Sequence, residues 1–157
     1  MATPTAQSHG LPVGTLVDGE LVVCDADGRP DLPRLLCRHG LTDPWWIRQA
    51  RHWCPVRYVL FDVLYYAGRC LVRETLARRQ AMLAAVCQRL DAADVQFSES
   101  VMGQGRALYA AALAQGHEGV LAKHRASQYR PSQRSVAWRK IKPRPRQTCS
   151  ARDLFSY

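Results

Sequence analysis

Lysine is scarce in this sequence: three lysines stand among 157 residues, against nineteen arginines. Glutamate is almost as rare, with four. The chain has no apolar run near the roughly 18 residues that a transmembrane helix requires, so no membrane span is predicted. Its first ten residues, MATPTAQSHG, show no basic stretch followed by an apolar one and do not predict a signal peptide. The predicted location is the cytoplasm, with no membrane partner.

No two cysteines form a C-x-x-C pair. The absence of such a pair argues against a zinc site, because structural zinc sites are commonly built from C-x-x-C pairs. In a cytosolic chain, free cysteines usually serve as small buried hydrophobic residues. We expect that role for the six cysteines present: Cys24, Cys37, Cys54, Cys70, Cys87 and Cys149.

The positive charge is concentrated in one segment of the chain. The formal net charge is +9, and residues 123–146 hold nine basic residues and no acidic one. The remainder has thirteen residues of each sign. Such a segment is either a solvated arginine-rich face or a surface for phosphate or nucleic acid. Tyr129 and Trp138 lie among the cations, which favours the second interpretation.

The length and the 47% apolar content suit a single domain with a buried core. Apolar alternation and β-branched runs predict a strand followed by a DADG turn within 14–30, and further strands in 56–66, 94–101, 118–124 and 136–142. Apolar stripes predict helices over 31–40, 75–90 and 105–116, with a helical turn after Pro44. This order predicts an α+β fold, a largely antiparallel sheet with packed helices. The domain is expected over residues 12–145, between poorly ordered tails at 1–11 and 146–157.

Two of the four glutamates stand in similar settings, Glu20 in "DGE" and Glu118 in "EG". Glutamates at strand ends are usually solvated. Two that face one cleft could instead hold Mg²⁺, which binds one or two carboxylates together with substrate phosphates and waters. The sequence leaves both interpretations open.

The last predicted strand places Lys140 and Lys142 on one face with Trp138. They could protect an exposed edge strand. They could also direct two ammonium groups at a phosphate, a task that suits the compact, flexible lysine better than the planar arginine. Lys123 alternates to the face opposite Glu118. Phe61, in the strong strand "VLFDVL", would by itself be interpreted as core packing, with Asp62 on the opposite face.

Four segments, taken together and in this order, resemble the adenylation domain of ATP-dependent DNA ligases, in the covalent nucleotidyltransferase superfamily. They are "LVDGELVV" for D-G-E, "YVLFDVLYYAGR" for F-D-x-L, "HEGVLAKH" for E-G-x-x-x-K, and "SQYRPSQRSVAWRKIKP" for the tyrosine loop and W-x-K-x-K. The helix "LARRQAML" also fits, and the loop spelling is most similar to the bacterial end-joining ligases. The resemblance implies the second half of a DNA-ligase/mRNA-capping-type (ATP-grasp-like) domain.

The resemblance also implies site residues. Phe61 would stack on adenine, Glu20 and Glu118 would serve the ribose and the metal, and Lys140 and Lys142 would contact the α-phosphate. Lys123 joins these residues as an ATP contact. The implied cofactors are ATP, as AMP donor, and Mg²⁺. The implied partner is nicked or broken double-stranded DNA, which suggests a nucleoid-associated protein. The candidate DNA-binding residues are Arg125, Arg130, Arg134, Arg139 and Arg144.

The family's first motif, K-x-D-G, carries the lysine that takes AMP, and this sequence does not contain it. The seventeen residues before Asp18 hold no lysine, and no oligonucleotide-binding barrel follows Lys142. We therefore expect a truncated or split ligase that cannot adenylate itself, with a separate polypeptide as a possible source of the K-x-D-G half. The alternatives are a non-enzymatic nucleic-acid-binding remnant and an RNA ligase or capping-type enzyme. A second departure is Ser132, which stands where the family usually has glycine.

Overall fold

The computed structural model describes residues 11–88, 90, 93–98 and 100–143. The predicted tails, apart from residue 11, and Arg144 lie outside this range. In chain order the elements are β1 (Leu16–Val22), α1 (Leu32–His39), α2 (Pro44–Trp53), β2 (Arg57–Tyr66), β3 (Arg69–Cys70), α3 (Leu76–Cys87), β4 (Val95–Phe97), α4 (Gly105–Ala114), β5 (Val120–Lys123) and β6 (Trp138–Ile141). None of the described helices is long and apolar enough to cross a membrane.

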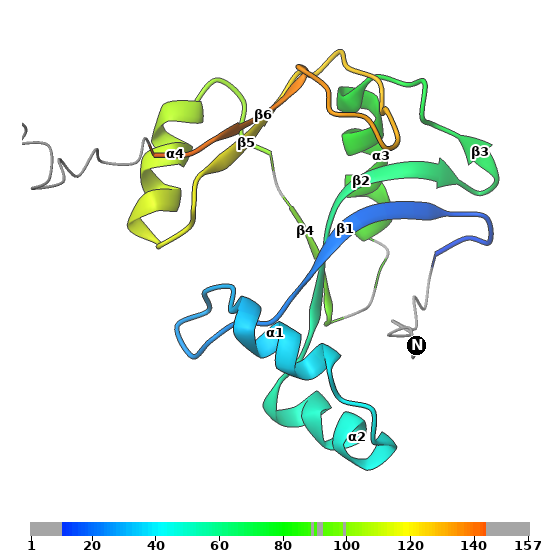
Figure 1. Ribbon diagram of the computed structural model, residues 1–157. Helices are drawn as coiled ribbons and strands as arrows, with labels where there is room; N and C mark the ends of the chain where they lie inside the picture. The colour runs from blue at the N-terminus through cyan, green and yellow to red at the C-terminus, as the bar shows by residue number, and fades with distance from the viewer. Residues whose placement is uncertain (1–10, 89, 91–92, 99, 144–157) are drawn as a thin grey trace, which may run out of the picture.

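The larger sheet is built around β2 (Figure 1). β1 pairs with β2 antiparallel along its length, with irregularities at Leu16/Val17 and Asp18/Gly19. β3 is antiparallel to the end of β2, whereas β4 pairs parallel with its beginning. The α+β class and the largely antiparallel sheet are confirmed, with β4 as the parallel exception.

The core lies between β2 and α3. Leu60, Val63, Leu71 and Leu83 form its buried cluster. The predicted apolar stripe of α3 is confirmed, with Leu76, Leu83 and Val86 buried and Cys87 and Leu90 half-buried. Thr75 caps this helix, because its side chain accepts a hydrogen bond from the backbone N–H of Arg78.

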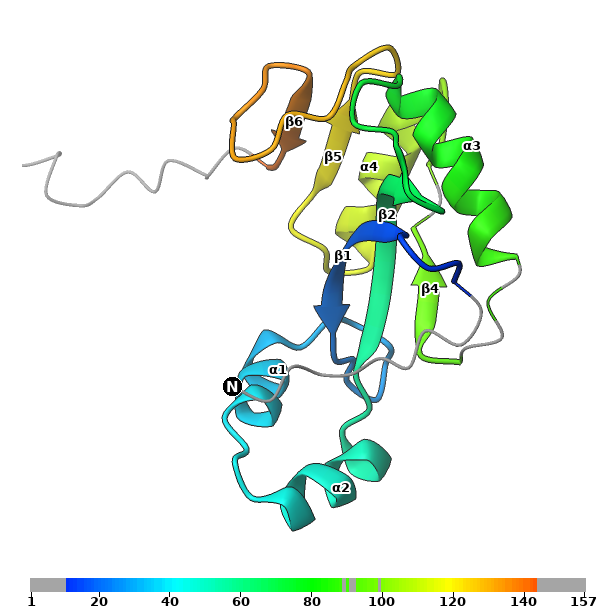
Figure 2. The same ribbon diagram turned by 90° about the vertical axis from the view of Figure 1, so that its right-hand side faces the viewer.

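The smaller sheet consists of β5 and β6 alone, paired antiparallel from Val120↔Ile141 to Lys123↔Trp138. None of the eight residues in these two strands is buried. In both views it lies at the opposite end of β1 and β2 from the two helices α1 and α2 (Figures 1 and 2). A two-stranded ribbon is at best marginally stable alone, so it depends on α4, which packs against β5, and on the contacts of its loop with the rest of the protein.

α2 is a full helix of ten residues, where the sequence predicted only a helical turn. Asp43 caps it by accepting from the backbone N–H groups of Trp45 and Trp46, and Pro44 stands at its first turn. The cysteine expectation is partly wrong. Cys54 is buried, but Cys37 and Cys70 are exposed, and Cys149 lies outside the described residues.

Candidate nucleotide site

Three of the motif segments meet at the side chain of Lys123. Its ammonium lies 4.5 Å from the ring centre of Phe61 on β2 and 4.1 Å from that of Trp138 on β6. Both contacts are cation–π interactions. Burial lowers the pKa of Lys123, with the carboxylates of Asp62 and Asp18 acting in the opposite direction. Residues far apart in the sequence thus form one aromatic-and-cationic cluster.

The register of the smaller sheet fixes the faces of its lysines. Lys123 is the cross-strand partner of Trp138, and Lys140 that of Leu121. Directly paired residues share a face, so Lys123 and Lys140 lie on the same side of the sheet. Lys140 is exposed. The expected grouping of Trp138 and Lys140 on one face agrees with this register.

Glu118, just before β5, accepts a hydrogen bond from the ammonium of Lys142 and forms an ion pair with it. This bond lowers the pKa of the Glu118 carboxyl, and the charge of the same lysine adds to the effect. Gly119 follows with φ +142°, and a Cβ there would lie 2.0 Å from the carbonyl oxygen of Ile141. Only glycine allows the chain to approach β6 this closely.

Glu20 lies on β1 and is exposed. The preceding Gly19 allows close pairing with β2, since a Cβ there would lie 2.6 Å from the Val59 carbonyl oxygen. Within the described residues, no group of three or more His, Cys, Asp or Glu side chains could hold a metal. The described contacts do not bring Glu20 and Glu118 together. Each is nevertheless an exposed carboxylate, the kind of single ligand that suffices for Mg²⁺ when phosphates and waters complete the shell.

A buried ion pair that the sequence did not predict supports the site. Arg79 on α3 and Asp62 on β2 are both fully buried, and Arg79 donates to the two carboxylate oxygens at 2.7 and 2.9 Å. It also donates to the carbonyl oxygens of Glu74, at 2.7 Å, and Ser127, at 3.3 Å. One guanidinium therefore connects β2, α3 and the loop that leads to β6. The sequence signal for the burial of Arg79 was its position within the apolar stripe of α3, three residues after Leu76.

The loop between β5 and β6 is anchored on the larger sheet. The backbone N–H groups of Leu76 and Ala77 donate to the carbonyls of Ser127 and Arg125. The Tyr129 hydroxyl donates to Asp18 on β1 at 2.8 Å. Burial, followed by this hydrogen bond, raises the pKa of Tyr129 to about 12. The tyrosine loop of the motif is therefore a structural connection between the two sheets.

Ser132 adopts φ +57°, a left-handed conformation. The loop thus has, at this position, the backbone geometry that glycine favours, although serine occupies it. Arg125, Arg130, Arg134 and Arg139 are all exposed. Arg139 is paired with Ala122, one residue out of phase with Lys140, so it points to the other face of the sheet.

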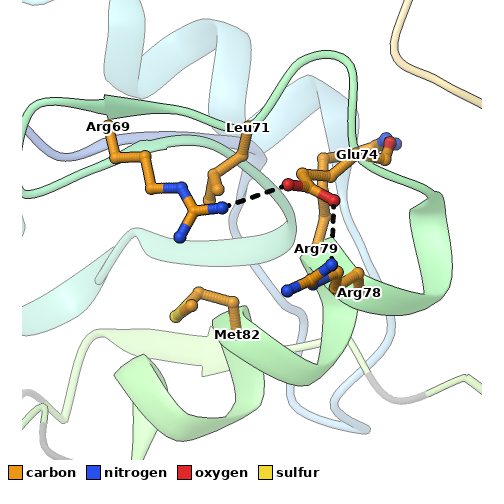
Figure 3. A pocket seen from close by; sticks show the side chains of 6 residues that line it. All are labelled: Arg69, Leu71, Glu74, Arg78, Arg79 and Met82. Atoms are coloured by element: carbon orange, nitrogen blue, oxygen red, sulfur yellow. Dashed lines mark hydrogen bonds and ion pairs between the residues drawn. The ribbon is translucent and has the colours of Figure 1, made fainter.

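A small hollow lies away from this cluster, between β3 and α3 (Figure 3). Glu74 stands there between Arg69, at 3.3 Å, and Arg78, at 3.5 Å. The hollow has a volume of about 40 Å³, which is too small for a nucleotide, and none of the predicted site residues lines it.

A family model described as "ATP dependent DNA ligase domain" matches residues 5–142. A DNA ligase of Methanothrix thermoacetophila is 34% identical over 128 residues, covering 82% of this chain and 23% of that protein. The multifunctional non-homologous end joining protein LigD of Pseudomonas aeruginosa is 37% identical over 131 residues, covering 83% of this chain and 14% of that protein.

Solved structures agree with this match. The mycobacterial DNA ligase D complexed with ATP and MES superimposes with a TM-score of 0.66 at 29% identity, covering 82% of this chain and 38% of that one. A Lig E DNA ligase, at 19% identity and a TM-score of 0.62 over 90% of this chain and 51% of that one, shares the fold. The chain spans 23% and 14% of the lengths of the two curated relatives. The extent of the family match shows that this chain belongs to the ATP-dependent DNA ligase domain family.

Proposed function

We propose that these residues form the base-, phosphate- and metal-contacting part of the adenylation site of an ATP-dependent DNA ligase. The observation that carries the proposal is the convergence at Lys123. The lysine that ends E-G-x-x-x-K lies against both the aromatic residue of F-D-x-L and the tryptophan of W-x-K-x-K. Core packing alone gives no reason to bring a cation between these two rings.

In the proposed reaction, a lysine attacks the α-phosphate of ATP and forms a lysine–AMP bond, while pyrophosphate leaves. Lys140 and Lys142 stabilise the negative charge that develops at this phosphorus, because preorganised cations act most strongly where charge builds up. Phe61 offers a ring face for the adenine. A base stacked on the face that Lys123 covers displaces the ammonium, which is then free to turn toward the phosphates.

Glu20 and Glu118 are the proposed metal ligands. Mg²⁺ would neutralise phosphate charge when bound. Glu118 is held by Lys142 in this structure, so binding of a cation at Glu118 has to compete with the lysine ammonium or share the carboxylate with it. The contact between Glu118 and Lys142 therefore couples metal binding at Glu118 to the position of Lys142, one of the two proposed phosphate-contacting lysines.

The nucleophilic lysine is the part that these 157 residues do not supply, since they contain no K-x-D-G sequence. We propose that it comes from a further segment, either of the same polypeptide or of a separate one. The names of the relatives, DNA ligase and non-homologous end joining protein, support nicked or broken DNA as the substrate. They favour DNA ligation over the RNA ligase and capping alternatives.

Incubation with radiolabelled ATP and Mg²⁺, followed by denaturing electrophoresis, tests the proposal. The 157-residue polypeptide alone should remain unlabelled, because a covalent step needs its nucleophile. Adding a K-x-D-G-bearing first half of a related adenylation domain should produce labelling of that half. Lys140→Met should reduce this labelling at least about tenfold, in the range found for lost transition-state contacts.

Arg78→Met, at an exposed arginine on α3, is the matched control and should label as the unmodified chain does. Labelling of this chain itself would show that one of its three lysines is the nucleophile. Association of the halves without labelling would favour the nucleic-acid-binding remnant.

The proposed duplex-DNA surface is tested separately. Arg130→Ala together with Arg134→Ala should weaken binding of nicked duplex and lower the slope of log K against log salt by about 1.8, from two phosphate contacts. An unchanged slope would identify these arginines as a solvated face.

A further inference from the structure

The two helices between β1 and β2 expose an unusual amount of indole surface. Three of the four tryptophans in the chain lie on α2, namely Trp45, Trp46 and Trp53. They are 51%, 52% and 57% exposed. α1 and α2 form an arm (residues 31–57) at the end of β1 and β2 that lies away from β5 and β6 (Figures 1 and 2). The tryptophans are thus separate from the candidate nucleotide site.

The inner face of α2 packs within the arm and leaves these rings half-exposed. Ala50 and Cys54 are buried at 0% and 3% exposure, and the Cys54 thiol donates to the Arg34 carbonyl oxygen of α1 at 4.0 Å. Helical spacing then places Trp45, Arg48 and His52 on the outer face, at i, i+3 and i+7.

The arm is also electropositive. It contains five arginines and two aspartates. Both aspartates are engaged, because Asp31 and Asp43 accept hydrogen bonds from the first backbone N–H groups of α1 and α2. Among the described residues, four of the arginines make no ion pair: Arg38, Arg48, Arg51 and Arg57. A polyanion is the complementary ligand for this surface.

We propose that the outer face of α2 binds single-stranded DNA, with Trp45 stacking on an unpaired base and Arg48 contacting a phosphate. Aromatic rings interleaved with cations are the usual means of binding single strands. A duplex offers phosphates to the arginines, but its bases are already stacked and paired, so the indole rings gain little from it. This binding is independent of the adenylation chemistry and adds a second nucleic-acid surface to the chain.

Fluorescence anisotropy of the full 157-residue chain with a fluorescein-labelled oligothymidylate tests the proposal. Trp45→Ala should weaken binding at least about fivefold, because a stacked base contributes about 1–3 kcal/mol. Arg48→Ala should lower the salt slope by about 0.7, from one single-strand phosphate contact. Alanine favours helix, so circular dichroism should show α2 intact in both variants.

Arg69→Ala with Arg78→Ala, two exposed arginines that pair with Glu74, is the matched control and should leave the affinity within twofold. The Arg130→Ala, Arg134→Ala variant separates the two surfaces. It should retain single-strand binding while weakening duplex binding, and Trp45→Ala should do the reverse. With these variants, a failure of the single-strand proposal is distinguishable from a failure of the proposed ligase site.

Two results would overturn the proposal. One is unchanged oligothymidylate affinity in the tryptophan variant, including the case in which sedimentation shows that the tryptophans mediate self-association instead. The other is an equal loss for single-stranded and duplex DNA in that variant, which would reduce the arm to a non-specific basic face.

Discussion

The two sheets of this protein are held by different forces. The larger sheet has a buried apolar cluster, and α3 covers β2. The smaller sheet has no buried residue in its strands. Helix α4 packs against β5, and the polar loop joins the sheet to the rest of the protein through Arg79 and Tyr129. The proposed site spans both, with Phe61 and Glu20 on the larger sheet and the three lysines on or next to the smaller one. The lysines are therefore positioned by the packing of α4 on β5, by the cation–π contacts of Lys123 and by polar contacts, outside the β2–α3 core.

The largest expected effect comes from the residue that joins the two sheets. Arg79→Met should lower the free energy of unfolding by about 3–5 kcal/mol, because it leaves the Asp62 carboxylate buried without its partner. Urea denaturation followed by circular dichroism measures the change. Arg78→Met, one residue earlier and exposed, should cost less than about 1 kcal/mol. Similar losses for the two variants would mean that the buried pair does not organise the fold.

The second effect concerns the hydroxyl that links the tyrosine loop to β1. Tyr129→Phe removes a 2.8 Å hydrogen bond to Asp18 while keeping the ring beside Trp138, whose centre is 5.9 Å away. We expect a loss of about 1–2 kcal/mol in the same urea measurement. No loss would indicate that water replaces the hydroxyl and that the loop is held by its backbone bonds.

The same side chain predicts a dependence on alkaline pH. The pKa of Tyr129 is raised from 10.0 to about 12 in the folded protein, so the unfolded chain releases this proton first. The stabilisation is complete below pH 10 and is lost as the pH rises toward 12. The stability gap between the unmodified chain and Tyr129→Phe should therefore narrow over this range. A gap that stays constant from pH 9 to 12 would contradict the raised pKa.

The smallest effect tests strain in a loop of each sheet. Ser132 has φ +57° beside the smaller sheet, and Ala67 has φ +48° in the turn after β2. Replacing either residue by glycine relieves a left-handed conformation, and we expect a gain of about 0.5–1 kcal/mol for each. Thermal unfolding of the two single variants measures it. A destabilised Ser132→Gly beside a stabilised Ala67→Gly would show that the serine side chain contributes to the loop.

Much of the fold could be predicted from sequence because its signals are local. The β-branched run of β2 and the apolar stripe of α3 identify the central strand and its covering helix. α2 was predicted only as a helical turn, because its tryptophans lie on exposed as well as partly covered sides and give no clear apolar period. The parallel pairing of β4 depends on the route of the chain, which local periodicity does not encode.

The residues of the candidate site came from the resemblance of D-G-E, F-D-x-L, E-G-x-x-x-K and W-x-K-x-K to the ligase motifs, and their roles stay predictions. The supports of the site had no such signal. Arg79 was missed because an arginine in a helix is usually solvated, and its burial depends on Asp62 of another element. Tyr129 and Asp18 are 111 residues apart, so their hydrogen bond has no local signal.

The smaller sheet, which carries or adjoins the proposed phosphate-contacting lysines, lies outside the β2–α3 core and should open separately from it. Native-state hydrogen exchange in low denaturant tests it most directly, by comparing amides of β5 and β6 with those of the β1–β2 ladder. We predict that the β5 and β6 amides exchange through a local opening of lower free energy, with little dependence on denaturant, while the β1–β2 amides exchange only through global unfolding. If the β5 and β6 amides and the β1–β2 amides exchanged with the same free energy of opening and the same denaturant slope, separate opening of the smaller sheet would be contradicted.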